Sequence, residues 1–105
     1  MTAMRKKMPE TEYRASRVCR ILGNPTAYQV VKSLFKHSRT PTELAAELGL
    51  SRQTVSDVLR TLRNIDLVRY EVKVDCRSYW LKHPTIVEIA LDLERLVKVI
   101  RIQEW

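Results

Sequence analysis

The stretch TPTELAAELGLSRQTVSDVLRTLRN, residues 40–64, contains two helix-start signals separated by a single glycine. Thr40 and Glu43 form a T-x-x-E capping box, and the proline after Thr40 stands at the first helical position, where its missing N–H costs nothing. Gly49 supplies the left-handed residue that ends the first helix, and Ser51 can cap the second. This stretch therefore predicts two short helices joined by a tight turn, as in a helix-turn-helix unit.

Leucine and valine recur in the same stretch at spacings of three and four, which places them on one side of each helix. They are Leu44 and Leu48 in the first helix, and Val55, Leu59 and Leu62 in the second. The two helices can therefore share one core, and the polar side of the second helix must face outward. That side consists of Arg52, Gln53, Ser56, Asp57 and Arg60.

The sequence on either side of this unit predicts two more helices and a hairpin. Apolar residues at near-helical spacing form a first helix that ends at Gly23, and Asn24-Pro25 opens the second as a cap followed by proline. Beyond the unit, residues 67–72 and 76–81 alternate between apolar and polar and predict two strands. Their turn lacks the Asn-Gly or Asp-Gly that a tight turn prefers, so we expect a loose tip.

From Thr85 onward the sequence predicts a long helix, opened by a second T-x-x-E box at Thr85 and Glu88. Its apolar residues occupy more than one side, so that one face can cover its own domain and a surplus remains. The surplus favours a partner helix and therefore a homodimer; a purely intramolecular role is the alternative. The expected fold class is mainly α with a small β-hairpin, a winged helix-turn-helix in the order helix-helix-helix-helix-strand-strand-helix.

The chain is strongly basic, and the excess is unevenly distributed. Its 105 residues contain 19 Lys and Arg against 12 Asp and Glu, a net charge of +7. All of this excess lies in residues 1–82, whereas residues 83–105 carry slightly more acidic than basic groups. A polyanion is therefore the expected partner of the first part, with a merely soluble basic protein as the alternative. We expect residues 1–9 to be a flexible basic arm and residues 10–105 to form one domain.

Several classes of protein are disfavoured by the composition. Cys19 and Cys76 form no C-x-x-C motif, and no apolar run approaches the roughly 20 residues of a membrane span. The basic N-terminus lacks the apolar segment of a secretory signal. With two glycines and no catalytic constellation, the chain is not expected to be an enzyme, and no cofactor or metal is predicted. We expect a cytoplasmic protein with reduced thiols.

Three segments carry a family resemblance: ILGNPTAYQVVKSL (21–34), TELAAELGLSRQTVSDVLRTLRNIDLVR (42–69) and SYWL (78–81). With the long closing helix, they resemble the ArsR/SmtB family of bacterial and archaeal transcriptional repressors over most of residues 13–103. The resemblance implies a sequence-specific regulator that binds double-stranded DNA as a homodimer at a pseudo-palindromic site. It also implies that the first and last helices form the dimer interface, to which we assign Val18, Ile21, Ile86, Ile89, Leu93, Leu96 and Ile100.

In such a domain the second helix of the unit lies in the major groove, with its first residues over the base edges. Arg52 can bind a guanine edge bidentately, Gln53 can do the same for adenine, and Ser56 can donate to a base or a phosphate. Asp57 departs from the family pattern and faces DNA favourably only if it accepts from cytosine or orients Arg60 or Arg52. The alternative for this whole face is a solvated helix surface.

Phosphate contacts are expected from helix starts and from the hairpin, which would be the wing. Hydroxyls at helix starts can bind phosphate or simply cap the helix; they belong to Thr40, Thr42 and Ser51. Basic side chains in or near the wing are expected to add salt-dependent affinity with little discrimination; they are Arg63, Arg69, Lys73 and Arg77. The aromatic residues Tyr70, Tyr79 and Trp80 are expected to pack within the hairpin.

The sequence contains no motif that identifies the signal controlling such a regulator. The family's metal sites use a cysteine pair in the first helix of the unit or Asp, His and Glu on the last helix; here the former reads TELAAEL and the latter has no histidine. Cys19 and Cys76 are a candidate redox pair, which would need Cα atoms about 6 Å apart, although a small buried hydrophobe is the more ordinary role of Cys19.

The other alternative for the function is a winged-helix protein-interaction module within a larger assembly, which the polar recognition-helix face disfavours.

Overall fold

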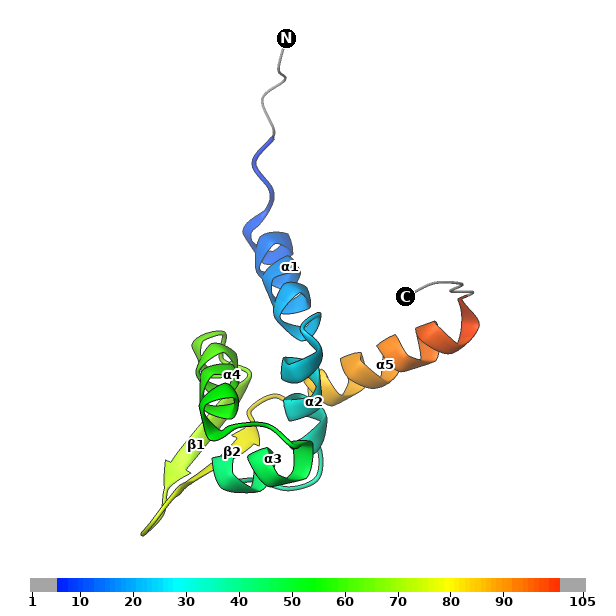
Figure 1. Cartoon of the computed structure of the whole chain (residues 1–105). Coiled ribbons are helices and arrows are strands. Elements are labelled where there is room, and N and C mark those ends of the chain that lie inside the picture. The colour runs from blue at the N-terminus through cyan, green and yellow to red at the C-terminus, as the bar shows by residue number, and fades with distance from the viewer. Residues whose placement is uncertain (1–5, 101–105) are drawn as a thin grey trace.

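The computed structural model describes residues 6–100, which form five helices and a two-stranded antiparallel sheet (Figure 1). The elements are α1 (Glu10–Leu22), α2 (Pro25–Ser33), α3 (Pro41–Leu48), α4 (Arg52–Asn64), β1 (Val68–Val72), β2 (Arg77–Leu81) and α5 (Thr85–Val99). Their order confirms the predicted winged helix-turn-helix. Parts of the predicted basic arm and of the closing segment, residues 1–5 and 101–105, lie outside the described residues.

One core joins α1–α4, the hairpin and the start of α5. Its most completely buried side chains are Val30, Val31, Leu44, Val55, Leu59, Leu62 and Val68. Three of these come from α4 at spacings of four and three, so the apolar side of α4 packs inward as predicted. The opposite, polar side of α4 must therefore face away from the core.

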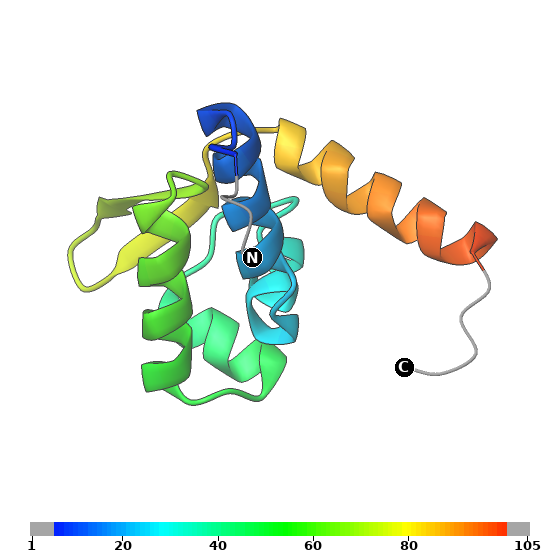
Figure 2. The same ribbon diagram turned by 90° about the horizontal axis from the view of Figure 1, so that it is seen from above.

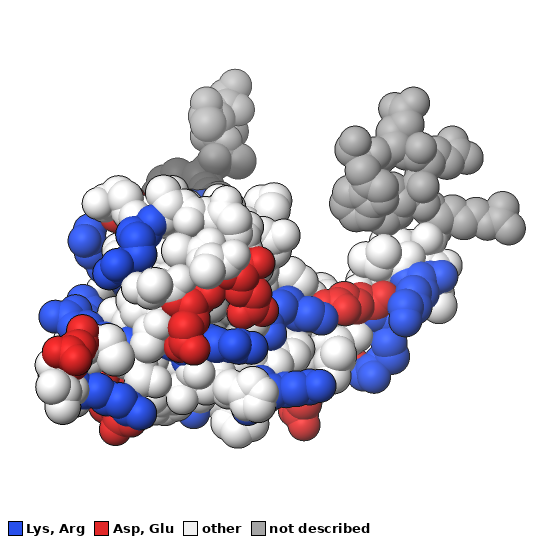
Figure 3. Space-filling model, turned by 60° about the horizontal axis from the view of Figure 1, so that its bottom comes forward, with Lys and Arg blue, Asp and Glu red and all other residues white. Residues whose placement is uncertain are grey.

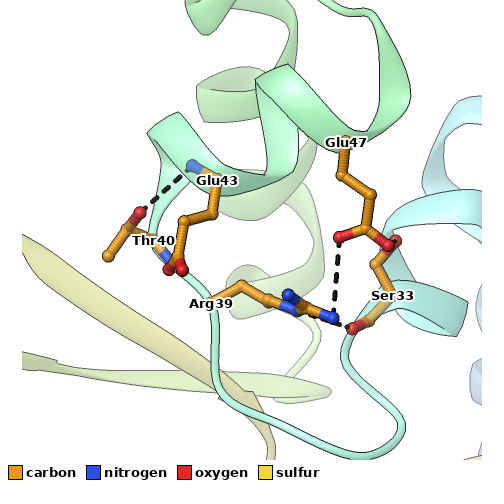
Figure 4. Close-up of polar contacts among 5 residues, drawn as sticks. All are labelled: Ser33, Arg39, Thr40, Glu43 and Glu47. Carbon is orange, nitrogen blue, oxygen red and sulfur yellow. Dashed lines mark hydrogen bonds and ion pairs between the residues drawn. The ribbon is translucent and has the colours of Figure 1, made fainter.

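The turn of the helix-turn-helix has the predicted local chemistry. The Glu43 N–H donates to the Thr40 hydroxyl oxygen at 3.1 Å, and the Thr40 N–H donates to the Glu43 carboxylate at 2.8 Å (Figure 4). Gly49 ends α3 in the left-handed region with φ of 68°, and Ser51 accepts the Thr54 N–H at 3.0 Å. The start and the end of α3 and the start of α4 are thus encoded by neighbouring residues.

Both strands begin one residue later than predicted. Leu67 does not belong to the sheet, because its N–H donates to the Leu62 carbonyl and so completes the end of α4. In the hairpin, Val68 pairs with Leu81 and Val72 with Arg77, which leaves residues 73–76 as the tip. Its closing bond runs from the Lys73 N–H to the Cys76 carbonyl at 2.7 Å.

The segment between α2 and α3 adds a contact that the sequence did not predict. Arg39 and Tyr79 exchange two backbone hydrogen bonds of 2.9 and 2.8 Å, so this segment lies along the outer edge of β2. The Arg39 side chain reaches the Ser33 carbonyl at 3.4 Å and the Glu47 carboxylate at 3.7 Å (Figure 4). The hairpin is therefore attached to the start of α3 as well as to α4.

The second predicted capping box, at Thr85 and Glu88, is wrong. The residue before the helix is Pro84, which already has helical dihedral angles, and no side chain caps this end. Thr85 is consequently the first helical residue, so its hydroxyl is not in the position from which a cap accepts an N–H. Cys19 differs too: it is exposed on α1 rather than a small buried hydrophobe.

Helix α5 leaves the body formed by the other elements, and its C-terminal end has no neighbouring element in either view (Figures 1 and 2). Polar contacts at Glu94, past the middle of α5, join the helix to α2. The Tyr28 hydroxyl donates to the Glu94 carboxylate at 2.6 Å, and the Lys32 ammonium donates to the same oxygen at 2.7 Å. Burial and the bond to Glu94 raise the pKa of Tyr28 to about 12, so its hydroxyl keeps its proton at neutral pH.

The Glu94 contacts predict an acid-sensitive contribution to stability. The bonds from Lys32 and Tyr28 lower the pKa of Glu94 below its usual value. A carboxyl with a lowered folded-state pKa stabilises the protein above its unfolded pKa, and this contribution disappears as the pH falls through the folded pKa. We therefore expect Glu94→Gln to lower the free energy of unfolding at pH 7, with the difference from wild type vanishing in acid.

Urea unfolding at a series of pH values measures this difference. Glu88→Gln, which removes an exposed carboxylate from the same helix, is the matched control and should show no comparable loss. A deficit of Glu94→Gln that stays constant from neutral pH into acid would mean that the carboxylate charge is not what attaches α5 to α2.

Candidate nucleic-acid interface

The outward side of α4 is fully accessible. Thr40, which caps α3, is half-buried, but the other eleven residues predicted to contact DNA have exposed side chains, namely Thr42, Ser51, Arg52, Gln53, Ser56, Asp57, Arg60, Arg63, Arg69, Lys73 and Arg77. They project from regular elements that the common core fixes, apart from Ser51, which caps α4, and Lys73 in the hairpin tip. The geometry required of a recognition helix is therefore present.

The starts of α3 and α4 and the hairpin tip surround an open groove of about 370 Å³. Five predicted contact residues line it, Thr40, Thr42, Arg52, Ser56 and Arg77. Asp75, Cys76 and Tyr79 contribute from the hairpin side. The fold thus brings residues 35 positions apart in the chain, Thr42 and Arg77, to one concave polar surface.

A second strip of α4 carries Gln53, Asp57 and Arg60, which do not line this groove. The Gln53 side-chain amide donates to an Asp57 carboxylate oxygen at 3.0 Å, and the Arg60 guanidinium lies 3.9 Å from the same oxygen. Asp57 therefore contacts a candidate cation, Arg60, as one of its two expected roles requires, and also a candidate base-reading amide, which the sequence analysis did not predict.

The basic residues of the wing divide between the two faces of the hairpin. Strand register places Arg77 on the same face as Tyr70 and Tyr79, whereas Arg69 lies on the other face and approaches Asp66 at 3.8 Å. Lys73 at the tip lies 3.7 Å from Glu71. The structure therefore assigns Arg69 to a different surface from the one that contains Arg77.

Asp66 is a structural residue that the sequence analysis missed. It has a φ of 64°, so it makes the left-handed turn from α4 into β1 that favours glycine or a short polar residue. The Lys82 ammonium donates to its carboxylate at 2.7 Å, and that bond is the largest of the effects that lower the pKa of Asp66. No sequence signal marks this position, because the partner lies 16 residues away.

Basic side chains lie over the hairpin and α4 in a view of this side of the molecule, with carboxylates among them (Figure 3). The surface is therefore a mosaic rather than a uniform positive patch. Cations that lie among carboxylates are partly neutralised, so the cations without such partners contribute most to the attraction of a polyanion.

The two cysteines do not meet. Cys19 lies on α1 and Cys76 next to β2, which point to opposite ends of the molecule (Figure 1), and both thiols are free. The predicted pair within one chain is therefore not brought together. Among residues 6–100, no three His, Cys, Asp or Glu side chains form a group that could bind a metal ion.

None of the helices in residues 6–100 combines the length and the apolar character that crossing a bilayer requires.

Comparisons with known proteins show what this chain is similar to in sequence and in fold. A profile of the family described as "Bacterial regulatory protein, arsR family" matches residues 24–70, from the cap of α2 into β1. That family consists of regulatory proteins, in agreement with the prediction that the chain is not an enzyme. No curated protein sequence matches the chain.

Solved structures of similar shape are numerous. HlyU from Vibrio cholerae is 24% identical with a TM-score of 0.76, covering 85% of this chain and 97% of that one. NolR from Sinorhizobium fredii is 24% identical with a TM-score of 0.76, covering 89% and 96%. The homodimeric winged helix-turn-helix DNA-binding domain of Mb0332 from Mycobacterium bovis is 17% identical with a TM-score of 0.75, covering 90% and 91%.

At these identities the similarity to solved structures establishes the fold alone. The profile match relates the sequence of residues 24–70 to a family. Together they show a winged helix-turn-helix fold in which residues 24–70 match the arsR family of bacterial regulatory proteins.

Proposed function

We propose that the protein is a homodimeric transcriptional repressor, acting in the cytoplasm, that reads a pseudo-palindromic duplex site with residues 51–64. The observation that carries this proposal is the exposed polar side of α4, which the buried opposite side fixes in place. Two copies related by a twofold axis would place their recognition helices about 34 Å apart, one turn of DNA. Bound at a promoter, the dimer would exclude the transcription machinery.

Base reading belongs to the first two turns of α4. Arg52 and Ser56 line the groove beside the wing, and Gln53 is oriented by Asp57 on the adjacent strip. Arg52 suits guanine and Gln53 suits adenine, each through two hydrogen bonds. The remaining candidates, Thr42, Ser51, Arg60, Arg63, Lys73 and Arg77, would bind phosphates and make the affinity depend on salt.

The dimer is proposed from the apolar surface of α5. Four of the assigned interface residues are large apolar side chains exposed on or just beyond this helix, namely Ile89, Leu93, Leu96 and Ile100, each at least 42% exposed. Val18 and Ile21 on α1 are half-buried against the core. Ile86 requires a correction: it is 2% exposed because it packs into the core of its own chain, so it is not available to a partner.

Exposed apolar side chains along one helix are typical of an interface. The homodimeric Mb0332 domain, whose fold is similar, supports the same assembly for this chain. The thiol-responsive alternative now rests on Cys76, which is exposed in the groove beside Arg77.

Replacement of Arg52 tests base reading. Arg52→Ala should weaken binding to a selected duplex by about 1–3 kcal/mol and relax the preference at one base pair, because a bidentate contact is lost. Competition binding against random duplex measures both effects. Lys36→Ala, which removes one charge outside α4 and the wing, is the matched control. An equal loss on selected and random duplexes would show that Arg52 only contacts phosphate.

Replacement of Asp57 tests its orienting role. Asp57→Asn removes a negative charge from the face that approaches phosphates and weakens the contact with Arg60. We expect binding to random duplex to become tighter by about 0.5–1 kcal/mol, the size of one exposed charge interaction, while the preference for the selected site falls. Titrations of both duplexes at the same salt concentration give the two values. Unchanged discrimination would contradict an orienting role.

Replacement of Leu93 and Ile100 by Asp tests the interface. Two buried charges cannot be accommodated between apolar helices, so the double variant should sediment as a monomer. Val74→Asp places a charge on a side chain that is 98% exposed at the hairpin tip, and should leave the assembly intact. A sedimentation coefficient that the double substitution does not change would remove α5 from the interface.

A further inference from the structure

We propose that Tyr70 is a positioning residue that brings Arg63 and Arg77 together as one phosphate-binding pair, linking the end of the recognition helix to the wing. This inference deepens the proposed function and rests on it. It assigns a role in DNA binding to a residue that the sequence analysis had placed only in hairpin packing.

Two guanidinium groups converge on the ring of Tyr70. The central carbon of Arg63 lies 5.4 Å from the ring centroid, and that of Arg77 lies 4.7 Å from it. Arg63 comes from the last turn of α4, and Arg77 is the first residue of β2. Both distances are within the range of a cation–π interaction, so the ring attracts both side chains to one place.

The ring itself is fixed to the core. Tyr70 on β1 is paired in register with Tyr79 on β2, and their ring centroids are 5.2 Å apart at an interplanar angle of 39°. Tyr79 is 7% exposed and belongs to the core cluster. Because Tyr79 cannot move without disturbing the core, Tyr70 is a rigid support for the two arginines and not a mobile surface side chain.

The charge balance at this point favours an anion. Within residues 6–100, neither Arg63 nor Arg77 forms an ion pair with a carboxylate, in contrast to Arg60, Arg69 and Lys73. The ring offsets only part of the repulsion between two guanidinium groups. A phosphodiester would satisfy both, since guanidinium matches phosphate geometry with paired hydrogen bonds.

Position along α4 identifies the DNA backbone as the ligand. Base edges are read by the first residues of a recognition helix, whereas Arg63 stands one residue before its end. Arg77 stands at the base of the hairpin tip, where a wing meets the sugar-phosphate chain. The pair would therefore add affinity that does not depend on sequence, and it would fix the angle between α4 and the wing on the duplex.

A mutant cycle on random-sequence duplex tests this inference. The variants are Tyr70→Leu, the matched control Tyr70→Phe that keeps the ring, Arg63→Ala/Arg77→Ala, and the triple variant with Tyr70→Leu. We expect Tyr70→Leu to weaken binding by at least about fivefold in the wild-type background and by less than about twofold when both arginines are absent. Tyr70→Phe should bind as wild type does.

Equal losses from Tyr70→Leu with and without the arginines would overturn the inference, as would a loss in Tyr70→Phe equal to that in Tyr70→Leu. Thermal unfolding of each variant checks the fold. If Tyr70→Leu does not fold, the single variants Arg63→Ala and Arg77→Ala replace it. If the two arginines share one phosphate, the product of the two single fold-losses in affinity is larger than the fold-loss of the double variant. Independent, multiplicative losses would also overturn it.

Salt dependence gives a second readout. Removing both arginines should reduce the slope of log affinity against log salt by about one, since a neutralised phosphate contributes about 0.9 and the pair shares one phosphate. An unchanged slope would mean that the pair does not bind phosphate. Failure of the proposed function can be told apart from failure of this inference, because the wild-type protein alone reveals it. Selection from a random pool of duplexes would then enrich no site, whatever the mutant cycle on random duplex shows.

Discussion

The packing of α4 on α3 is the constraint on which the rest of the molecule depends. Leu44 from α3 meets Val55, Leu59 and Leu62 from α4 in one core from which water is excluded. Burial of side chains of this size stabilises the domain by about 1.5–3 kcal/mol each, far more than any single surface contact. The same packing allows only one rotation of α4 about its axis, so it decides which side chains face outward. The left-handed Gly49 makes the short connection between the two helices stereochemically accessible.

Around this unit, polar contacts determine how the functional surface is shaped. The Arg39–Tyr79 bridge attaches the hairpin to the start of α3, and Asp66 turns the chain from α4 into β1. The two attachments hold the hairpin beside the starts of α3 and α4, so that Arg52 and Arg77 line the same groove. The bridge consists of two backbone hydrogen bonds and the Asp66 ion pairs lie at the surface, so each is individually weak, but both act on a hairpin whose inner face is already buried. The core therefore sets the orientation of the wing, and the polar contacts of Arg39 and Asp66 at its edges support that orientation.

Helix α5 follows a different principle. Its first turns contribute Ile86 and Ala90 to the core, and the bonds from Tyr28 and Lys32 to Glu94 fix its direction. Beyond that point its apolar side chains have no cover in the described chain (Figures 1 and 2). In the proposed dimer, the Glu94 contacts would set the angle at which the two DNA-binding units leave their interface. The spacing of the recognition helices would then depend on a polar cluster far from the DNA.

The sequence by itself determined the helix-turn-helix, whose signals are local. The capping box at Thr40, the turn at Gly49, the cap at Ser51 and the periodicity of α4 depend on neighbours within one or two helical turns, and all are present as predicted. Only the tertiary structure decided the rest. Whether Ile86 is buried in its own chain and whether Tyr70 gathers Arg63 and Arg77 depend on how elements are placed in three dimensions. Spacing along the chain carries no information about a contact made by packing across it.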